Sequence, residues 1–218
     1  MKRLFGLIVI FLVGSLWANA QSFSKDIWHE GEVGLFSGEI LRGKIKYDLD
    51  NNSLQITTGG IVRSLSSYQV ESFQFFDELQ KTPRSFFTLP YKRIGNYESP
   101  VFFELLYEGT KLTLLNREVF VQRAIGAANP WGWGWWGLPR MSMGTTAVQS
   151  DSYYILDMEK EQVIKLGDQR GDWLLLMRDF RDEMSEFIRV NKLSVTERKD
   201  VLKIMAYYDE LIKTSNKK

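Results

Sequence analysis

The segment Glu39-Ile40-Leu41-Arg42-Gly43-Lys44-Ile45-Lys46-Tyr47, residues 39–47, shows the clearest two-residue alternation in this chain of 218 residues. Its leucine, glycine, second isoleucine and tyrosine point one way, whereas the three cationic side chains between them point the other. An apolar face opposite a charged face, repeating every two residues, is typical of a half-buried antiparallel strand. The segment therefore predicts a fold built mainly from β-strands.

Similar short strands are expected on both sides of this segment, because clusters of turn-forming residues divide the chain between them. Gly59-Gly60 predicts a tight hairpin turn, since both glycines tolerate a positive φ. Nine or ten strands follow from this pattern. Those beyond the opening segment are residues 32–36, 54–58, 61–65, 68–77, 84–89, 101–107, 111–122, 152–158 and 162–166.

After Gly167 the hydrophobic period changes to that of a helix. This spacing predicts one helix over Asp172–Asn191 and a second that ends near Lys213, with Ser194 and Glu197 as a capping box at its start. We expect an α+β fold, mainly β, in which an antiparallel curled sheet, a small barrel or a sandwich precedes two C-terminal helices. The expected division is a β domain over residues 21–166 and a helical pair, packed on it, over residues 167–218.

The first twenty residues have the pattern of a secretory signal peptide. Lys2 and Arg3 precede the apolar run Leu4–Trp17, and Ala18-Asn19-Ala20 supplies the small residues of a cleavage site. An uncleaved anchor is the alternative, but the run is shorter than the ~20 residues that span a bilayer. We therefore expect cleavage after Ala20 and export, most simply to a periplasm.

Composition excludes several classes of site. The chain contains no cysteine, which rules out a lipoprotein anchor, disulfides and thiolate metal sites. The net charge is +1, and loss of Lys2 and Arg3 brings it to 1 − 2 = −1, so no basic field exists to hold nucleic acid. His29 is the one histidine, and we interpret it as a surface or partly packed residue. No catalytic residue, metal or cofactor is expected.

Residues 124–149 break the strand rhythm with a loop rich in glycine and tryptophan. Its candidate contact residues are Trp131, Trp133, Trp135 and Trp136, which glycines separate. Exposed indoles could stack on a cell-envelope glycan, enter a membrane interface or contact another envelope protein. The alternative is an insertion that folds its aromatic side chains back over the β domain and binds nothing.

Several carboxylates flank the expected strands, and a glycosidase-like pair would need two of them across a cleft. Their spacing selects no pair. The candidates are Glu71, Asp77, Glu78, Glu98, Glu104 and Glu108.

Two resemblances add to this interpretation. Residues 33–56, with Gly38 between strands and Gly43 within the next strand, resemble small Sm-like and SH3-like barrels, which implies a bent meander. The signal ending Ala20-Gln21, together with residues 68–77 and 101–106 and Tyr207-Tyr208, makes the whole chain similar to uncharacterised exported proteins of Bacteroidetes. That resemblance implies a Gram-negative periplasm and no particular activity.

The sequence thus favours an exported binding or structural accessory protein of the cell envelope. A carboxylate-dependent hydrolase acting on envelope glycan is the alternative. The oligomeric state is left open.

Overall fold

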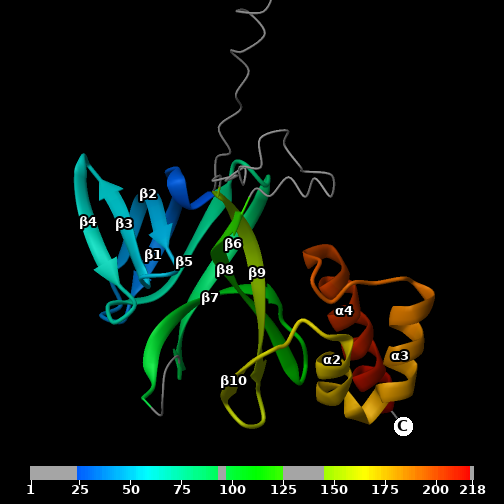
Figure 1. The fold of residues 1–218 in the computed structure, drawn as a ribbon. Coiled ribbons are helices and arrows are strands. Elements are labelled where there is room, and N and C mark those ends of the chain that lie inside the picture. Colours follow the sequence, from blue (N-terminus) through cyan, green and yellow to red (C-terminus); the bar gives the residue numbers. More distant parts are fainter. Residues whose placement is uncertain (1–23, 93–96, 125–144, 217–218) are drawn as a thin grey trace, which may run out of the picture.

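The computed structural model describes residues 24–92, 97–124 and 145–216 (Figure 1). Within these ranges the chain forms ten strands, three α-helices and two short 3-10 helices. The strands are β1 (His29–Leu35), β2 (Ile40–Asp48), β3 (Ser53–Thr58), β4 (Ile61–Ser66), β5 (Val70–Asp77), β6 (Thr82–Tyr91), β7 (Ser99–Tyr107), β8 (Leu112–Ala124), β9 (Thr145–Asp157) and β10 (Gln162–Lys165). The helices are η2 (Ser24–Asp26), α2 (Arg170–Leu176), η3 (Arg178–Phe180), α3 (Arg181–Val190) and α4 (Arg198–Ser215).

All ten strands join one antiparallel sheet in the order β10-β9-β8-β7-β6-β5-β1-β2-β3-β4. The expected mainly β fold with C-terminal helices is confirmed. The sheet is open, however, with β10 and β4 as its two edges among the described residues. The strands therefore build a single open sheet rather than a closed barrel or a two-sheet sandwich, and the sheet is not strongly curled.

One face of this sheet carries two hydrophobic cores. The register sets Leu41, Val33, Phe73, Phe86, Glu104, Asn116 and Tyr153 side by side in a single cross-strand row. Residues opposite one another in a sheet share a face. The apolar start of the row belongs to a core built by β1–β7, and Tyr153 at its end belongs to a core shared with the helices. Two polar residues separate the two cores.

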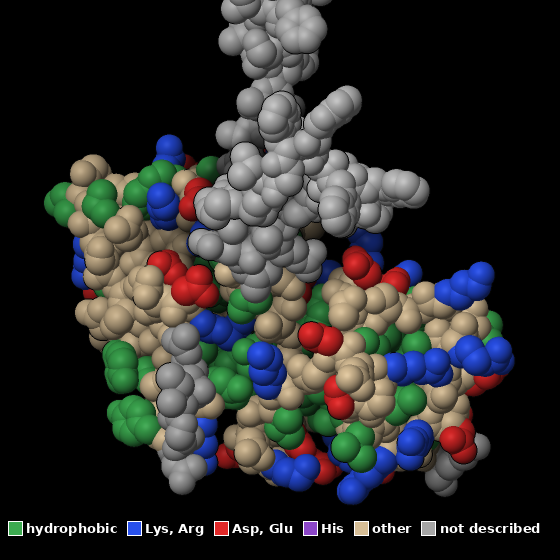
Figure 2. All heavy atoms as spheres, in the orientation of Figure 1, with side chains coloured by type: hydrophobic (Ala, Val, Ile, Leu, Met, Phe, Trp, Pro, Cys, Tyr) green, Lys and Arg blue, Asp and Glu red, His purple; other side chains and the backbone are tan. Residues whose placement is uncertain are grey.

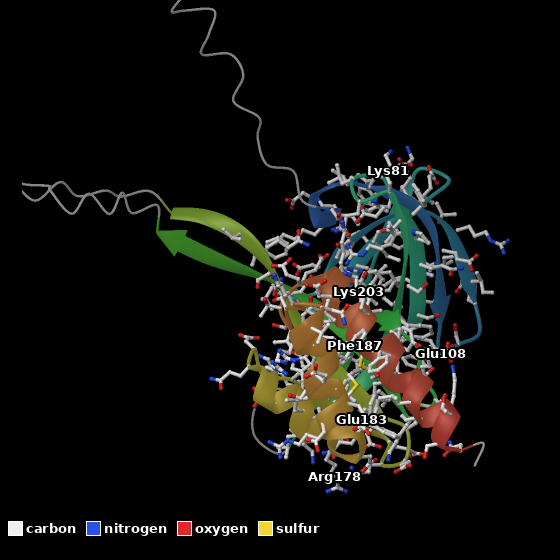
Figure 3. The ribbon with its side chains drawn as sticks, turned by 90° about the vertical axis from the view of Figure 1, so that its right-hand side faces the viewer. Lys81, Glu108, Arg178, Glu183, Phe187 and Lys203 are labelled. Carbon is white, nitrogen blue, oxygen red and sulfur yellow. The ribbon has the colours of Figure 1, made fainter. Side chains whose placement is uncertain are left out.

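The helices cover the β7–β9 end of this face, while β1–β4 lie at the other end of the sheet (Figure 1). Trp173 of α2, Ile188 of α3 and Ile204 of α4 pack in one core with Ile155 of β9. Seen from the side, α3 and α4 lie over the sheet, with Phe187 and Lys203 on neighbouring helices (Figure 3). The Phe187 and Tyr207 rings stack with centroids 4.0 Å apart. No helix within the described residues combines the length and apolarity needed to cross a bilayer.

The helical prediction was wrong in two details. The expected helix over Asp172–Asn191 is broken after α2, because Met177 and Phe180 take non-helical backbone angles. No proline or glycine lies between Trp173 and Asn191, so tertiary packing, not local sequence, imposes this break.

The capping box also fails to form. Glu197 is the N-cap residue of α4 but makes no side-chain cap hydrogen bond. The carboxylate of Asp200 instead accepts a hydrogen bond from the backbone N–H of Ser194, at 3.1 Å. Ser194 Oγ accepts a hydrogen bond from the backbone N–H of Thr196 at 3.2 Å, before the helix begins, so the connection is stabilised by Asp200 and by a local turn rather than by a capping box.

Glycines occupy the turns of the β1–β4 meander, as predicted. Gly59 and Gly60 have φ of 58° and 83° and form the two-residue β3–β4 turn, in which Thr58 pairs with Ile61. Gly38, with φ of 85°, follows β1. Gly43 is required because the backbones of β2 and β3 approach closely there. A Cβ at this position would lie well inside contact distance of the Thr57 carbonyl oxygen.

Replacing Gly43 with alanine should therefore lower the free energy of unfolding by about 1–3 kcal/mol, because the strand must move away from β3. Gly171→Ala is the matched control. A Cβ at Gly171, within α2, would meet nothing within 4 Å. This change should leave stability equal or higher by up to about 1 kcal/mol. Equal urea midpoints for both variants would contradict the close approach.

Candidate functional site

A buried arginine lies between the two cores. Arg84 of β6 directs Nε and Nη2 at the two carboxylate oxygens of Glu104 on β7, at 2.8 and 2.9 Å. Nη2 also lies 2.6 Å from Oε1 of Glu118 on β8, and Nη1 lies 3.2 Å from Oδ2 of Asp77 on β5. The side chains of all four residues are at most 1 % exposed. We call this group, with Tyr47 and Arg198 described next, the buried charge cluster.

Two further side chains connect the cluster to the rest of the fold. Arg84 Nη1 donates to the Tyr47 hydroxyl at 2.9 Å, and that hydroxyl donates to Glu118 at the same distance. Arg198, the first residue of α4, donates to both carboxylate oxygens of Glu104, the Nη1 bond measuring 3.0 Å. The cluster therefore joins β2, four consecutive strands and a helix.

The balance of charge in the cluster is uneven. Asp77, Glu104 and Glu118 face two guanidinium groups, so the described cluster holds one acid more than it has bases to neutralise. Like charges in a shared site favour protonation of one member. The cluster is therefore expected to keep a proton on one carboxyl group.

The pKa shifts identify that group. Burial pushes the pKa of Glu104 upward, but Arg84 and Arg198 outweigh it and hold the pKa below the usual value. Burial raises the pKa of Glu118, Arg84 opposes this, and the negative charge of Glu104 adds to the rise, so the net shift is upward. For Asp77, burial is outweighed by hydrogen bonds from Ser24, Gln80 and Arg84, and its pKa is lowered. Glu118 thus carries the extra proton most readily.

The cluster brings together two of the carboxylates considered from the sequence, Asp77 and Glu104. Glu118, which sequence reasoning missed, joins them through Arg84. The other four candidates, Glu71, Glu78, Glu98 and Glu108, are exposed. Because its carboxylates are sealed from solvent and bound to arginine, the buried charge cluster is suited to holding strands and helix together rather than to meeting a substrate.

On the opposite face of the sheet, β7 and β8 carry a third buried core with β9, whereas the part over β1, β5 and β6 is accessible. Two adjoining hollows of about 320 and 190 Å³ share Glu32, Gln74 and Ser85 and together form what we call the outer-face groove. Its centre is a cross-strand row of four side chains from β2, β1, β5 and β6. The row consists of Arg42, Glu32, Gln74 and Ser85.

Hydrogen bonds order this row. Glu32 accepts one from Arg42 Nε at 3.2 Å and another from Gln74 Nε2 at 2.7 Å. Phe76 and Phe87 stand on either side of the row along the strands and are 44 % and 40 % exposed. Phe76 is paired with Pro83, four residues before Phe87, so the two rings lie about 13 Å apart along the strands. The groove thus offers polar side chains between two aromatic surfaces.

Alternation in residues 72–76 indicates which side chains of β5 share the outer face. The groove itself depends on the pairing of β5 with β1, whose partners are some forty residues apart, such as Glu32 and Gln74. No local pattern indicates that register, so sequence analysis alone does not predict the groove.

A separate hollow, of about 530 Å³, lies where the β8–β9 end of the sheet meets η3 and α4. It contains two carboxylates, Glu159 and Asp179, and both pair with Lys111, at 3.7 and 3.3 Å. These carboxylates are 67 % and 50 % exposed, as in ordinary surface ion pairs. Figure 2 shows acidic and basic side chains interspersed over the helices, with no broad field of one sign.

The remaining predicted residues have different outcomes. His29 is fully buried rather than at the surface. Its Nε2 lies 2.7 Å from the Ser24 carbonyl oxygen, and its ring stacks on that of Phe75. Residues 145–149 of the expected loop belong to β9. Trp131, Trp133, Trp135 and Trp136 lie outside the described residues. Among residues that are described, no three His, Asp or Glu side chains are placed to hold a metal ion.

Comparison of the chain with protein-family models, with curated proteins and with solved structures found no match.

Opposite shifts at Glu104 and Glu118 predict opposite pH effects. Where the folded pKa lies below the unfolded value, as at Glu104, the unfolded chain binds more protons and stability rises with pH up to about 4.5. Where the folded pKa lies above the unfolded value, as at Glu118, the folded chain binds more protons. Stability then falls as pH rises from about 4.5 to the folded pKa.

Glu118→Gln should therefore remove the loss of stability that Glu118 causes above a pH of about 4.5. Urea unfolding at a series of pH values measures this effect. Glu104→Gln should instead lower the free energy of unfolding at neutral pH by about 3–5 kcal/mol, because the buried guanidinium of Arg84 and the partly exposed one of Arg198 lose their shared carboxylate. Identical pH profiles for the two variants would refute the assignment of the extra proton to Glu118.

Proposed function

We propose that this chain is an exported, periplasmic binding or structural accessory protein of the cell envelope and that the outer-face groove is its ligand surface. The single observation that carries the ligand surface is the ordered polar row between two exposed aromatic rings. Export is supported by the signal-peptide pattern of residues 1–20 and by the similarity to exported proteins of Bacteroidetes.

The fold suits such a role. The buried charge cluster and two cores fill one face of the sheet, so the strands that carry the groove are held from behind. A rigid sheet presents its side chains in fixed positions, which lowers the entropy lost on binding. The Trp-rich loop remains a second candidate contact to glycan, membrane interface or envelope protein, through Trp131, Trp133, Trp135 and Trp136.

The alternative, a carboxylate-dependent hydrolase acting on envelope glycan, has less support. Such an enzyme needs two accessible carboxylates with different pKa values. The pair whose pKa values diverge, Glu104 and Glu118, is sealed inside the cluster. Glu159 and Asp179, which line one hollow, share the ammonium group of Lys111. In another hollow, lined by Asp26 and Asp48, the Asp48 carboxylate accepts hydrogen bonds from Asp50 and Asn51. A binding role therefore fits the geometry better.

The test is retention of the protein on sedimented cell envelopes from a Gram-negative host that expresses the whole chain. We expect a periplasmic protein whose N-terminal residue is Gln21 and which sediments with envelopes. Ser85→Arg should abolish sedimentation, because the larger side chain fills the groove. If cells that express Ser85→Arg release intact envelope proteins, that result would also support the accessory role.

Ser64→Arg is the matched control, since Ser64 lies on the exposed edge strand β4, outside the groove, and gains the same charge. Changing the four loop tryptophans to alanine separates the two candidate surfaces. Cytosolic protein with an intact N-terminus, or sedimentation that survives Ser85→Arg and the loop variant alike, would overturn the proposal.

A further inference from the structure

We infer that the outer-face groove binds an uncharged, extended oligosaccharide that lies along β5 and β6 from Phe76 to Phe87. This rests on the proposed function, whose ligand surface it uses, and adds the chemical class of the ligand. Its support comes from the charge of the groove, the availability of backbone groups and the placement of aromatic rings.

The charges on this face cancel locally. Glu32 in the polar row receives hydrogen bonds from both Arg42 and Gln74, and the neighbouring Glu30 lies 3.9 Å from Lys44. The remaining cation of the lining, Arg84, points into the buried charge cluster. A groove without net charge gives no electrostatic advantage to a phosphate, a polyanion or a cationic peptide. An uncharged ligand fits this balance.

Backbone availability argues against a peptide. Extended peptides usually bind at a sheet edge, where unpaired N–H and C=O groups accept a new strand. The groove crosses β1, β5 and β6, each of which is paired with a neighbour on both sides. The groove therefore offers a ligand side chains rather than backbone groups. Hydroxyl groups distributed around a sugar can use such side chains as donors and acceptors.

The aromatic rings supply the apolar contact that sugar rings need. A pyranose has faces of C–H groups that pack on an aromatic ring, while its hydroxyls point outward to polar partners. Phe76 and Phe87 lie on either side of the polar row, about 13 Å apart along the strands. Gly34 and Ser72 have small side chains, which leave space at the bottom of the groove beside Phe87. A short linear chain of sugars can contact both rings and the row between them.

The test is calorimetric titration of the purified protein with four neutral tetrasaccharides: chitotetraose, cellotetraose, xylotetraose and maltotetraose. At least one should bind, and tetragalacturonic acid, which is anionic, should bind more weakly. Phe76→Ala and Phe87→Ala should each raise the Kd of that ligand about fivefold, the effect of losing one ring contact. Phe36→Ala, which removes an exposed ring outside the groove lining, is the matched control and should leave the Kd unchanged.

Equal melting temperatures for the three alanine variants will show that a lost affinity is not a lost fold. No binding by any of the four neutral tetrasaccharides, or binding that Phe36→Ala weakens as much as the groove variants do, would overturn the inference. The envelope experiment separates this failure from that of the proposed function. Sedimentation that depends on Ser85 but is not competed by any neutral tetrasaccharide refutes the glycan and leaves the accessory role intact.

Discussion

Burying a guanidinium group costs several kcal/mol unless carboxylates and hydrogen-bond acceptors surround it. This constraint applies to Arg84, whose side chain is fully buried. Its donors reach Glu104, Glu118, Asp77 and the Tyr47 hydroxyl, which come from four different strands. Shifting any of these strands would leave buried charge without a partner. The pairing of the strands and the position of the α4 N-terminus, fixed through Arg198, are consequently tied to one side chain.

The same register that satisfies Arg84 also builds the outer-face groove. Side chains alternate between faces along a strand, so Arg84 on the inner face is followed by Ser85 on the outer one. A slip of one residue would exchange the faces, removing both the buried charge cluster and the polar row. The interior of the sheet and its accessible groove therefore depend on the same pairing. The buried face provides rigidity, and the opposite face of β1, β5 and β6 remains accessible.

Local patterns predicted what is local. Alternation in residues 39–47 and the Gly59-Gly60 turn correspond to β2 and the β3–β4 hairpin. Nine strands begin and end within three residues of their expected positions, whereas β9 begins seven residues earlier than expected. Three features had no local signal. The break at Met177–Phe180 lacks proline and glycine, Glu118 is one of several polar residues in β8, and the groove needs the distant pairing of β1 with β5. Each is decided by contacts between residues far apart in the chain, which a single sequence does not display.

The most direct test of the central claim is a pH titration of the side-chain carboxyl carbons of Glu104 and Glu118 by NMR. The account predicts that the Glu118 carbon titrates above, and the Glu104 carbon below, the ordinary glutamate pKa of 4.5. Titration of both carbons near that ordinary value would mean that the two groups are solvated. In that case Arg84 would not be the buried link on which the sheet, the helix and the groove depend.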